Sequence, residues 1–287
     1  MVTMRRMLMS LSSMAEPEQP TEPEPEPTGA NSTVAFDAEL DAILNRIAPA
    51  TESGHKKLRG MIFSDPGEGK TTLIGGIPNN LILDTEEGTN VLVNTAPNVD
   101  VIPFKSFYQA QVIVDRLGQN VPQLAKYETF SMDTISFLHK KGLAEVTERE
   151  WAKAPSAVNQ FVAETEHHTE NNEHMRRLVA AAIQLDRNLI LTCHARTVQK
   201  KGEIEKTYPD FSEKLANTIN GMLDFVGYLY TTEIDGEEHK VLKLRQGTSG
   251  IVCKTRITTM PENLIDPTWD KIWDLFQEHN ASKKTVS

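Results

Sequence analysis

The residues best suited to chemistry in this 287-residue chain lie where an apolar segment runs into a glycine-rich turn. Two glycines in such a turn let backbone N–H groups point inward, and a following helix N-terminus adds to this nest for anions. The next lysine can reach the terminal phosphates, and the threonine after it can offer its hydroxyl to Mg²⁺. The residues expected around a nucleoside triphosphate are Ser64, Asp65, Pro66, Gly67, Glu68, Gly69, Lys70, Thr71 and Thr72.

This turn departs from the phosphate-loop pattern G-x-x-x-x-G-K-[ST] at one position, because Ser64 stands where the first glycine is expected. Serine lacks the freedom of glycine at positive φ, so we expect a negative φ at Ser64. A chance Gly-Lys-Thr sequence in a surface turn is the alternative interpretation. The apolar strand predicted over residues 59–63 argues against it, since a phosphate loop must follow a strand.

Three further polar groups follow predicted strands, at the sheet edge where parallel α/β folds place their ligands. Asp133 is expected to hold Mg²⁺ through water, although a plain turn aspartate is the alternative. Glu86 is the candidate for orienting or deprotonating the attacking water, and Glu87 competes for that assignment. His194 can hydrogen-bond the γ-phosphate, or it can be a structural histidine.

Strands that alternate with helices position these groups. Apolar segments predict strands over residues 80–83, 99–103, 128–133 and 189–193, and apolar residues at helical spacing predict helices over 107–117 and 175–183. This alternation predicts a mostly parallel sheet flanked by helices. Two later apolar segments joined across Asp235-Gly236 predict an antiparallel hairpin, and residues 269–276 predict a C-terminal amphipathic helix.

Composition limits the class of protein. The chain has 39% hydrophobic and 24% charged residues, two cysteines and no apolar run of membrane-spanning length, so we expect a cytoplasmic protein without a membrane partner. The net charge of −10 argues against coating nucleic acid with the whole surface. We predict four parts: a disordered Met/Glu/Pro-rich tail over 1–34, a helix and linker over 35–55, an NTPase domain over 56–276 and a tail over 277–287.

The order of these motifs resembles one family. The phosphate loop, the Asp84-x-Glu86-x-Gly88 element, Asp133, a strand ending in Cys193-His194 and a late Lys-x-Arg pair are similar to the RecA-core NTPases of bacteriophages. Many of those resemble single-strand annealing and recombination proteins. The resemblance covers roughly residues 56–276 and implies a RecA-like fold that binds ATP and Mg²⁺.

The resemblance also implies roles for individual residues. Glu86 matches the catalytic glutamate, and His194 matches the residue that senses the γ-phosphate, where recombinases commonly carry Asn-Gln. Lys254 and Arg256 match a pair that reaches the nucleotide of a neighbouring subunit in rings or filaments, although a solvated strand face is an alternative. The partners implied are single-stranded DNA, further copies of this chain and a single-stranded DNA-binding protein.

The predicted function is ATP-dependent binding of single-stranded DNA that promotes annealing or recombination of phage DNA. We expect the DNA contact in a loop after His194, at Arg196, Lys200, Lys201 and Lys206, although Glu203 and Glu205 keep a solvated loop as an alternative. One other function left open is an ATPase that loads or remodels a protein partner without gripping DNA. A nucleotide-binding module with negligible hydrolysis is the third.

Overall fold

The computed structural model describes residues 41, 44, 57–92, 96, 99–156, 158, 159, 161–199 and 205–284. The chain divides into two units, residues 1–49 and 50–287. In the first unit only Asp41 and Leu44 are described, and both are helical. The predicted disordered tail over 1–34 therefore lies outside the described residues, as does most of the predicted helix and linker over 35–55.

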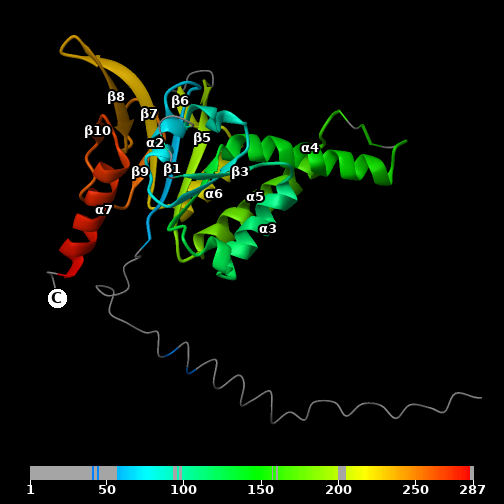
Figure 1. Cartoon of the computed structure of the whole chain (residues 1–287). Coiled ribbons are helices and arrows are strands. Elements are labelled where there is room, and N and C mark those ends of the chain that lie inside the picture. Colours follow the sequence, from blue (N-terminus) through cyan, green and yellow to red (C-terminus); the bar gives the residue numbers. More distant parts are fainter. Residues whose placement is uncertain are drawn as a thin grey trace, which may run out of the picture. The chain divides into compact units, whose positions relative to one another are not determined.

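One β-sheet forms the centre of the second unit (Figure 1). Its strands are β1 (Arg59–Ser64), β2 (Asn80–Asp84), β3 (Asp100–Pro103), β4 (Thr129–Asp133), β5 (Asn188–Val198), β6 (Lys206–Pro209), β7 (Phe225–Ile234), β8 (Glu237–Lys243), β9 (Lys254–Thr255) and β10 (Asn263–Ile265). Their order is β10-β8-β7-β1-β5-β4-β2-β3, with β6 on β5 and β9 on β7. All pairs from β7 to β3 are parallel, and the remaining pairs are antiparallel.

Helices pack on both faces of this sheet. The α-helices are α2 (Lys70–Gly75), α3 (Phe107–Gly118), α4 (Ile135–Lys153), α5 (Thr165–Ile183), α6 (Glu213–Met222) and α7 (Trp269–Lys284), and the short 3₁₀ helices are η1 (Gly88–Leu92) and η2 (Pro122–Leu124). One buried cluster joins the sheet to α3, α4, α5 and α6, and a second joins its other face to α2, η1 and α7.

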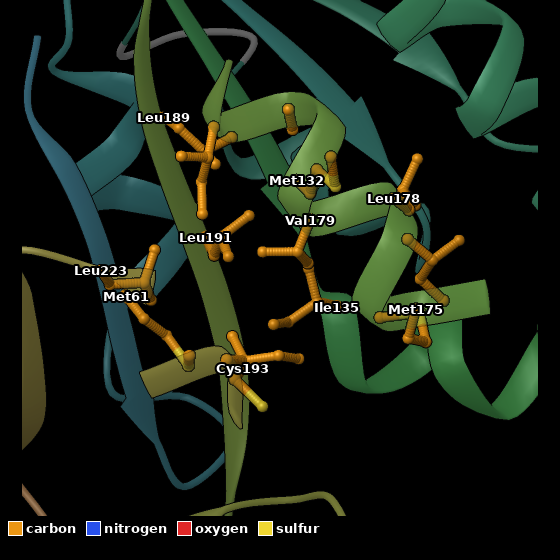
Figure 2. Close-up of a cluster of buried hydrophobic side chains, with 14 of the residues drawn as sticks. Met61, Met132, Ile135, Met175, Leu178, Val179, Leu189, Leu191, Cys193 and Leu223 are labelled. Atoms are coloured by element: carbon orange, nitrogen blue, oxygen red, sulfur yellow. The ribbon is translucent and has the colours of Figure 1, made fainter. Parts of the chain in front are cut away.

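Central strands such as β1 carry apolar side chains at successive positions, and these side chains alternate between the two faces, so both faces of the sheet are apolar. Met61 and Phe63 of β1 belong to the first cluster, whereas Ile62 between them belongs to the second, because successive strand residues point to opposite faces. Figure 2 shows the first cluster, in which Leu191 of β5 and Val179 of α5 lie between the sheet and the helices. Complete burial of these side chains on both faces holds the central strands in one register.

The predicted α/β fold class is confirmed: helices flank a mostly parallel sheet, and β7 and β8 form the C-terminal antiparallel hairpin. The sequence did not predict α4, whose buried positions include Ser136, Gly142 and Thr147, so its apolar periodicity is weak. Within the described residues no helix is long and apolar enough to cross a membrane.

The predicted tail over 277–287 is wrong in its boundary. Helix α7 continues to Lys284, and His279 within it is buried. The Nδ1 atom of His279 lies 2.9 Å from the hydroxyl of Thr258, so this last part of the helix also contacts the domain. A buried polar residue such as His279 adds nothing to the apolar periodicity of a helix. The prediction, which followed that periodicity, therefore stopped at Phe276.

Candidate nucleotide-binding and catalytic site

The phosphate loop connects the end of β1 to the start of α2. Gly67 and Gly69 have φ angles of 88° and 92°, values that L-residues with side chains rarely adopt. Ser64 is not among the residues with positive φ, as its replacement of glycine requires. The loop therefore has glycine where the backbone needs it, and serine where it does not.

Ser64 also has a direct role in this loop. The ammonium group of Lys70 donates to the Ser64 hydroxyl at 2.8 Å, and to the carbonyl oxygens of Ser64 at 3.2 Å and Asp65 at 3.1 Å. Burial lowers the pKa of Lys70 below its ordinary value, although the charges of Asp133 and Glu86 oppose this shift. The loop thus holds a buried cation ready for an anionic ligand.

Asp133 lies at the end of β4 and faces the phosphate loop, as the sequence predicted. Its carboxylate accepts hydrogen bonds from the hydroxyl of Thr71, at 2.6 Å, and from the hydroxyl of Thr192. Burial raises the pKa of Asp133 above its ordinary value, and these two hydrogen bonds only partly offset it. A divalent cation at this position would therefore compensate a carboxylate that is poorly solvated.

Glu86 follows β2, and its carboxylate is held at both oxygens. The hydroxyl of Thr134 donates to Oε1 at 2.5 Å, and Nε2 of His194 lies 3.4 Å from Oε2. Burial would raise the pKa of Glu86, but the hydrogen bonds from His194 and Thr134 and the charges of His194 and Lys70 together outweigh it, so this pKa lies below its ordinary value. Glu87 is exposed, so the structure brings Glu86 and His194 together and leaves Glu87 outside their contact.

A chain of hydroxyl groups joins Glu86 to the backbone of β5. The N–H of His194 donates to the hydroxyl of Ser136 at 3.1 Å, and the Ser136 and Thr134 oxygens are 3.0 Å apart. Because Thr134 donates its hydrogen to Glu86, Ser136 must be the donor between the two hydroxyls. Glu86 is thus connected to the ring of His194 directly and to its backbone through two hydroxyl groups.

Asp84 and Thr85 hold the segment that carries Glu86. The buried carboxylate of Asp84 accepts the N–H groups of Glu86, Gly88 and Thr89. The Thr85 hydroxyl accepts the Thr134 N–H at 2.8 Å, which ties this segment to the end of β4. The sequence showed Asp84 within the Asp-x-Glu-x-Gly element, but its role as a backbone anchor is visible only in the structure.

The hairpin of β7 and β8 lies against the phosphate loop, which the sequence did not predict. The ammonium of Lys240 donates to the Glu68 carbonyl at 3.0 Å, and the Thr231 hydroxyl donates to the Glu68 carboxylate at 2.7 Å. Lys240 also lines a cavity of about 390 Å³ together with Thr72 and residues around Trp269 at the start of α7. This volume falls in the range of small-ligand sites.

Two of the four predicted DNA-binding residues, Arg196 and Lys206, lie in strands and not in a loop. β5 continues to Val198 and pairs with β6, so Arg196 stands opposite Tyr208, and Lys206 stands opposite Val198. Lys200 and Lys201 lie outside the described residues. For Arg196 and Lys206 the prediction of a loop was wrong, because the polar residues of this antiparallel pair carry no apolar alternation.

Lys254, in β9, and Arg256, which follows β9, both contact the C-terminal end of α6. The ammonium of Lys254 donates to the carbonyls of Asn220 and Leu223, and Arg256 donates to the carbonyl of Gly221 at 2.6 Å. Cations at a helix C-terminus satisfy its free carbonyls and interact favourably with its dipole. The pair thus has a structural role within this chain, and its contact with a neighbouring nucleotide stays a prediction.

The fold and this site define a P-loop nucleoside triphosphatase, and comparison with known proteins agrees. Residues 56–257 match the AAA domain family AAA_24, and the chain belongs to this family. The crystal structure of the flagellar accessory protein FlaH from Methanocaldococcus jannaschii is similar over 79% of this chain and 89% of that chain, with 13% sequence identity and a TM-score of 0.38. No curated protein matches the chain.

The residues present fit a nucleotide with Mg²⁺. The loop N–H groups and Lys70 would bind phosphates, while the oxygens of Thr71 and Asp133 are of the kind that Mg²⁺ prefers. Such an ion neutralises charge on the phosphates. Thr134 and His194 fix the position of Glu86, which would accept a proton from the attacking water or orient it in such a complex.

We predict that Lys70→Ala weakens nucleotide binding by roughly 10- to 150-fold, since a lost hydrogen bond to a charged group costs about 1.5–3 kcal/mol. Titration of a fluorescent ATP analogue measures this, with circular dichroism as the check on folding. Lys126→Ala is the matched control, because Lys126 is an exposed cation paired with Asp100. If the folded Lys70→Ala variant bound nucleotide with unchanged affinity, the assignment of Lys70 to the binding site would be wrong.

We predict that Glu86→Gln retains nucleotide binding but lowers turnover by at least ~100-fold, the scale of a lost general base. Glutamine still accepts the Thr134 hydrogen bond, so the change tests the charge and not the fold. Glu87→Gln is the control, and steady-state ATPase rates measure both. An inactive Glu87 variant beside an active Glu86 variant would shift the assignment by one residue.

Proposed function

We propose that this ATPase binds single-stranded DNA and uses ATP to promote its annealing or recombination, with phage DNA as the substrate suggested by the motif order. One observation carries the proposal: the strand that presents His194 to the nucleotide site continues into a hairpin with cations on one face. The same strand, β5, would then contact DNA in its hairpin with β6 and contact Glu86 at the site of ATP hydrolysis.

The hairpin face follows from the register of β5 and β6. Residues that stand opposite each other share a face, and so do residues two apart, so Arg196, Val198, Lys206 and Tyr208 lie on one side. Arg196 and Lys206 are exposed. Two exposed cations beside an aromatic ring are typical of surfaces that bind single strands through phosphates and stacked bases.

The charge of the whole chain limits the DNA contact to this kind of local surface. With a net charge of −10, the chain as a whole repels a phosphate backbone. Specific contacts must therefore come from a small number of cations, and their loss should be easy to measure. The residues between β5 and β6 that lie outside the described part include Lys200 and Lys201.

A second function, loading or remodelling of a protein partner without DNA contact, has one observation in its favour. Phe161 is 86% exposed and Val162 is 56% exposed in the segment between α4 and α5. Exposed apolar residues of this size can mark a protein-binding surface. Stimulation of ATP turnover by single-stranded DNA separates the two functions, since only the first requires it.

We predict that the double variant Arg196→Glu, Lys206→Glu binds single-stranded DNA at least ~10-fold more weakly, with a salt slope reduced by about 2, since two phosphate contacts are lost. Fluorescence anisotropy at several salt concentrations, together with ATPase rates with and without DNA, measures this. Lys126→Glu, which changes an exposed cation before β4, is the control. Unchanged affinity and slope would favour the protein-remodelling function.

The proposed active form is a homo-oligomer, a ring or a filament, in which Lys254 and Arg256 meet a neighbour's nucleotide. In that case Arg256→Ala keeps nucleotide binding but lowers hydrolysis, because an arginine supplied in trans is worth ~10³-fold or more. Mixing Arg256→Ala with Glu86→Gln subunits should restore part of the ATPase activity. If mixed oligomers form but stay inactive, Arg256 does not act on a neighbour's nucleotide, and its contact with α6 is its only role.

A further inference from the structure

A second cavity of about 390 Å³ lies on the cationic face of the hairpin, away from the phosphate loop's own contacts. Three elements form its walls: the β5–β6 hairpin, α6, and the segment between β8 and β9. The side chains that decide its chemistry are Lys206, Tyr208, Asn217, Asn220, Gln246 and Thr248.

Hydrogen bonds between the walls hold this cavity open. The N–H of Thr207 donates to the Gly250 carbonyl at 3.2 Å, and the N–H of Val252 donates to the Thr207 carbonyl at 2.9 Å, which joins the segment to β6. Lys254 binds the last carbonyls of α6, which joins the same segment to that helix. The cavity is therefore built by the fold, and not by the chance position of one side chain.

The lining suits a flat ligand that carries hydrogen-bonding groups on its edge. Tyr208 offers an aromatic ring, Val198 and Val252 are apolar, and Asn217 and Gln246 carry amides that both donate and accept. Asn220 is buried, and its Oδ1 atom has no hydrogen-bond partner among the described residues. This oxygen is covered by the wall, so the amides that a ligand in the cavity can reach are those of Asn217 and Gln246.

Charge at the rim identifies the ligand further. Lys206 lines the cavity, and Arg196 lies on the same hairpin face two residues before Val198. Cations beside a cavity with an aromatic ring and amides match one nucleotide unit, in which a planar base is attached to an anionic phosphate. Glu213 also lines the cavity, and a carboxylate can accept the exocyclic amino group of a base.

We propose that this cavity receives one unstacked base of single-stranded DNA, while Arg196 and Lys206 contact the adjoining phosphates. This inference rests on the proposed function, because it describes how the strand is held. It assigns the hydrogen-bonding groups of Asn217 and Gln246 to the base edge and the ring of Tyr208 to its face. Because β5 also carries His194, a base bound at this hairpin lies on the strand that contacts Glu86.

The test compares two labelled strands of equal length, one of deoxycytidines and one with an abasic backbone, by fluorescence anisotropy with the full chain. We expect the base-bearing strand to bind ~10-fold more tightly, the scale of one or two stacked bases. Tyr208→Leu and Asn217→Ala should each reduce this ratio towards one while leaving the affinity for the abasic strand unchanged. Asn217 is exposed, so its variant does not disturb the core.

Thr197→Ala is the control, since Thr197 lies on the opposite face of the hairpin and should not change the ratio. Equal binding of both strands by the wild-type chain overturns the base site and leaves DNA binding through phosphates intact. A ratio that survives both cavity variants also overturns it, because the bases are then read elsewhere. If neither strand binds, the proposed function fails and the base site fails with it.

Discussion

The parallel register of four neighbouring strands is the constraint on which the site depends. It places Ser64 of β1 beside His194 of β5, and Asp84 of β2 beside Asp133 of β4. Each of these residues ends its strand or stands where the chain leaves the sheet, so groups from distant parts of the sequence meet at one edge. A shift by one residue in any pair would turn every side chain of the shifted strand to the opposite face.

This arrangement gathers carboxylates where water has little access, and the structure offsets the cost with hydroxyl groups and one lysine. Asp133 receives two hydroxyl hydrogen bonds, Glu86 receives one and contacts His194, and Lys70 lies among the loop carbonyls. Burial raises the pKa of Asp133 and lowers the pKa of Lys70, so it favours the neutral form of each side chain. An anionic ligand would compensate the charge of Lys70, and a divalent cation would compensate that of Asp133. Binding of the two together would therefore neutralise the buried charges of the site.

Strand β5 connects this site to the hairpin that β5 forms with β6. Its apolar first half is buried between α5 and the neighbouring strands, and its second half leaves the sheet to pair with β6. Close packing holds this buried half in place, because tightly packed side chains resist small shifts. The cavity beside α6 lies at the far end of this strand, and Lys254 connects its outer wall to α6.

The sequence by itself determined the phosphate loop, the central strands and the positions of Glu86, Asp133 and His194, because glycine spacing and apolar periodicity are local properties. Only the tertiary structure decided which groups hold them: Thr134 reaches Glu86 across 48 positions of sequence, and Thr71 reaches Asp133 across 62. It also turned the predicted loop around Arg196 into a paired strand and gave Lys254 a helix terminus to bind. Such partners are chosen by packing between distant segments, and polar residues leave no periodic signal from which a sequence could predict them.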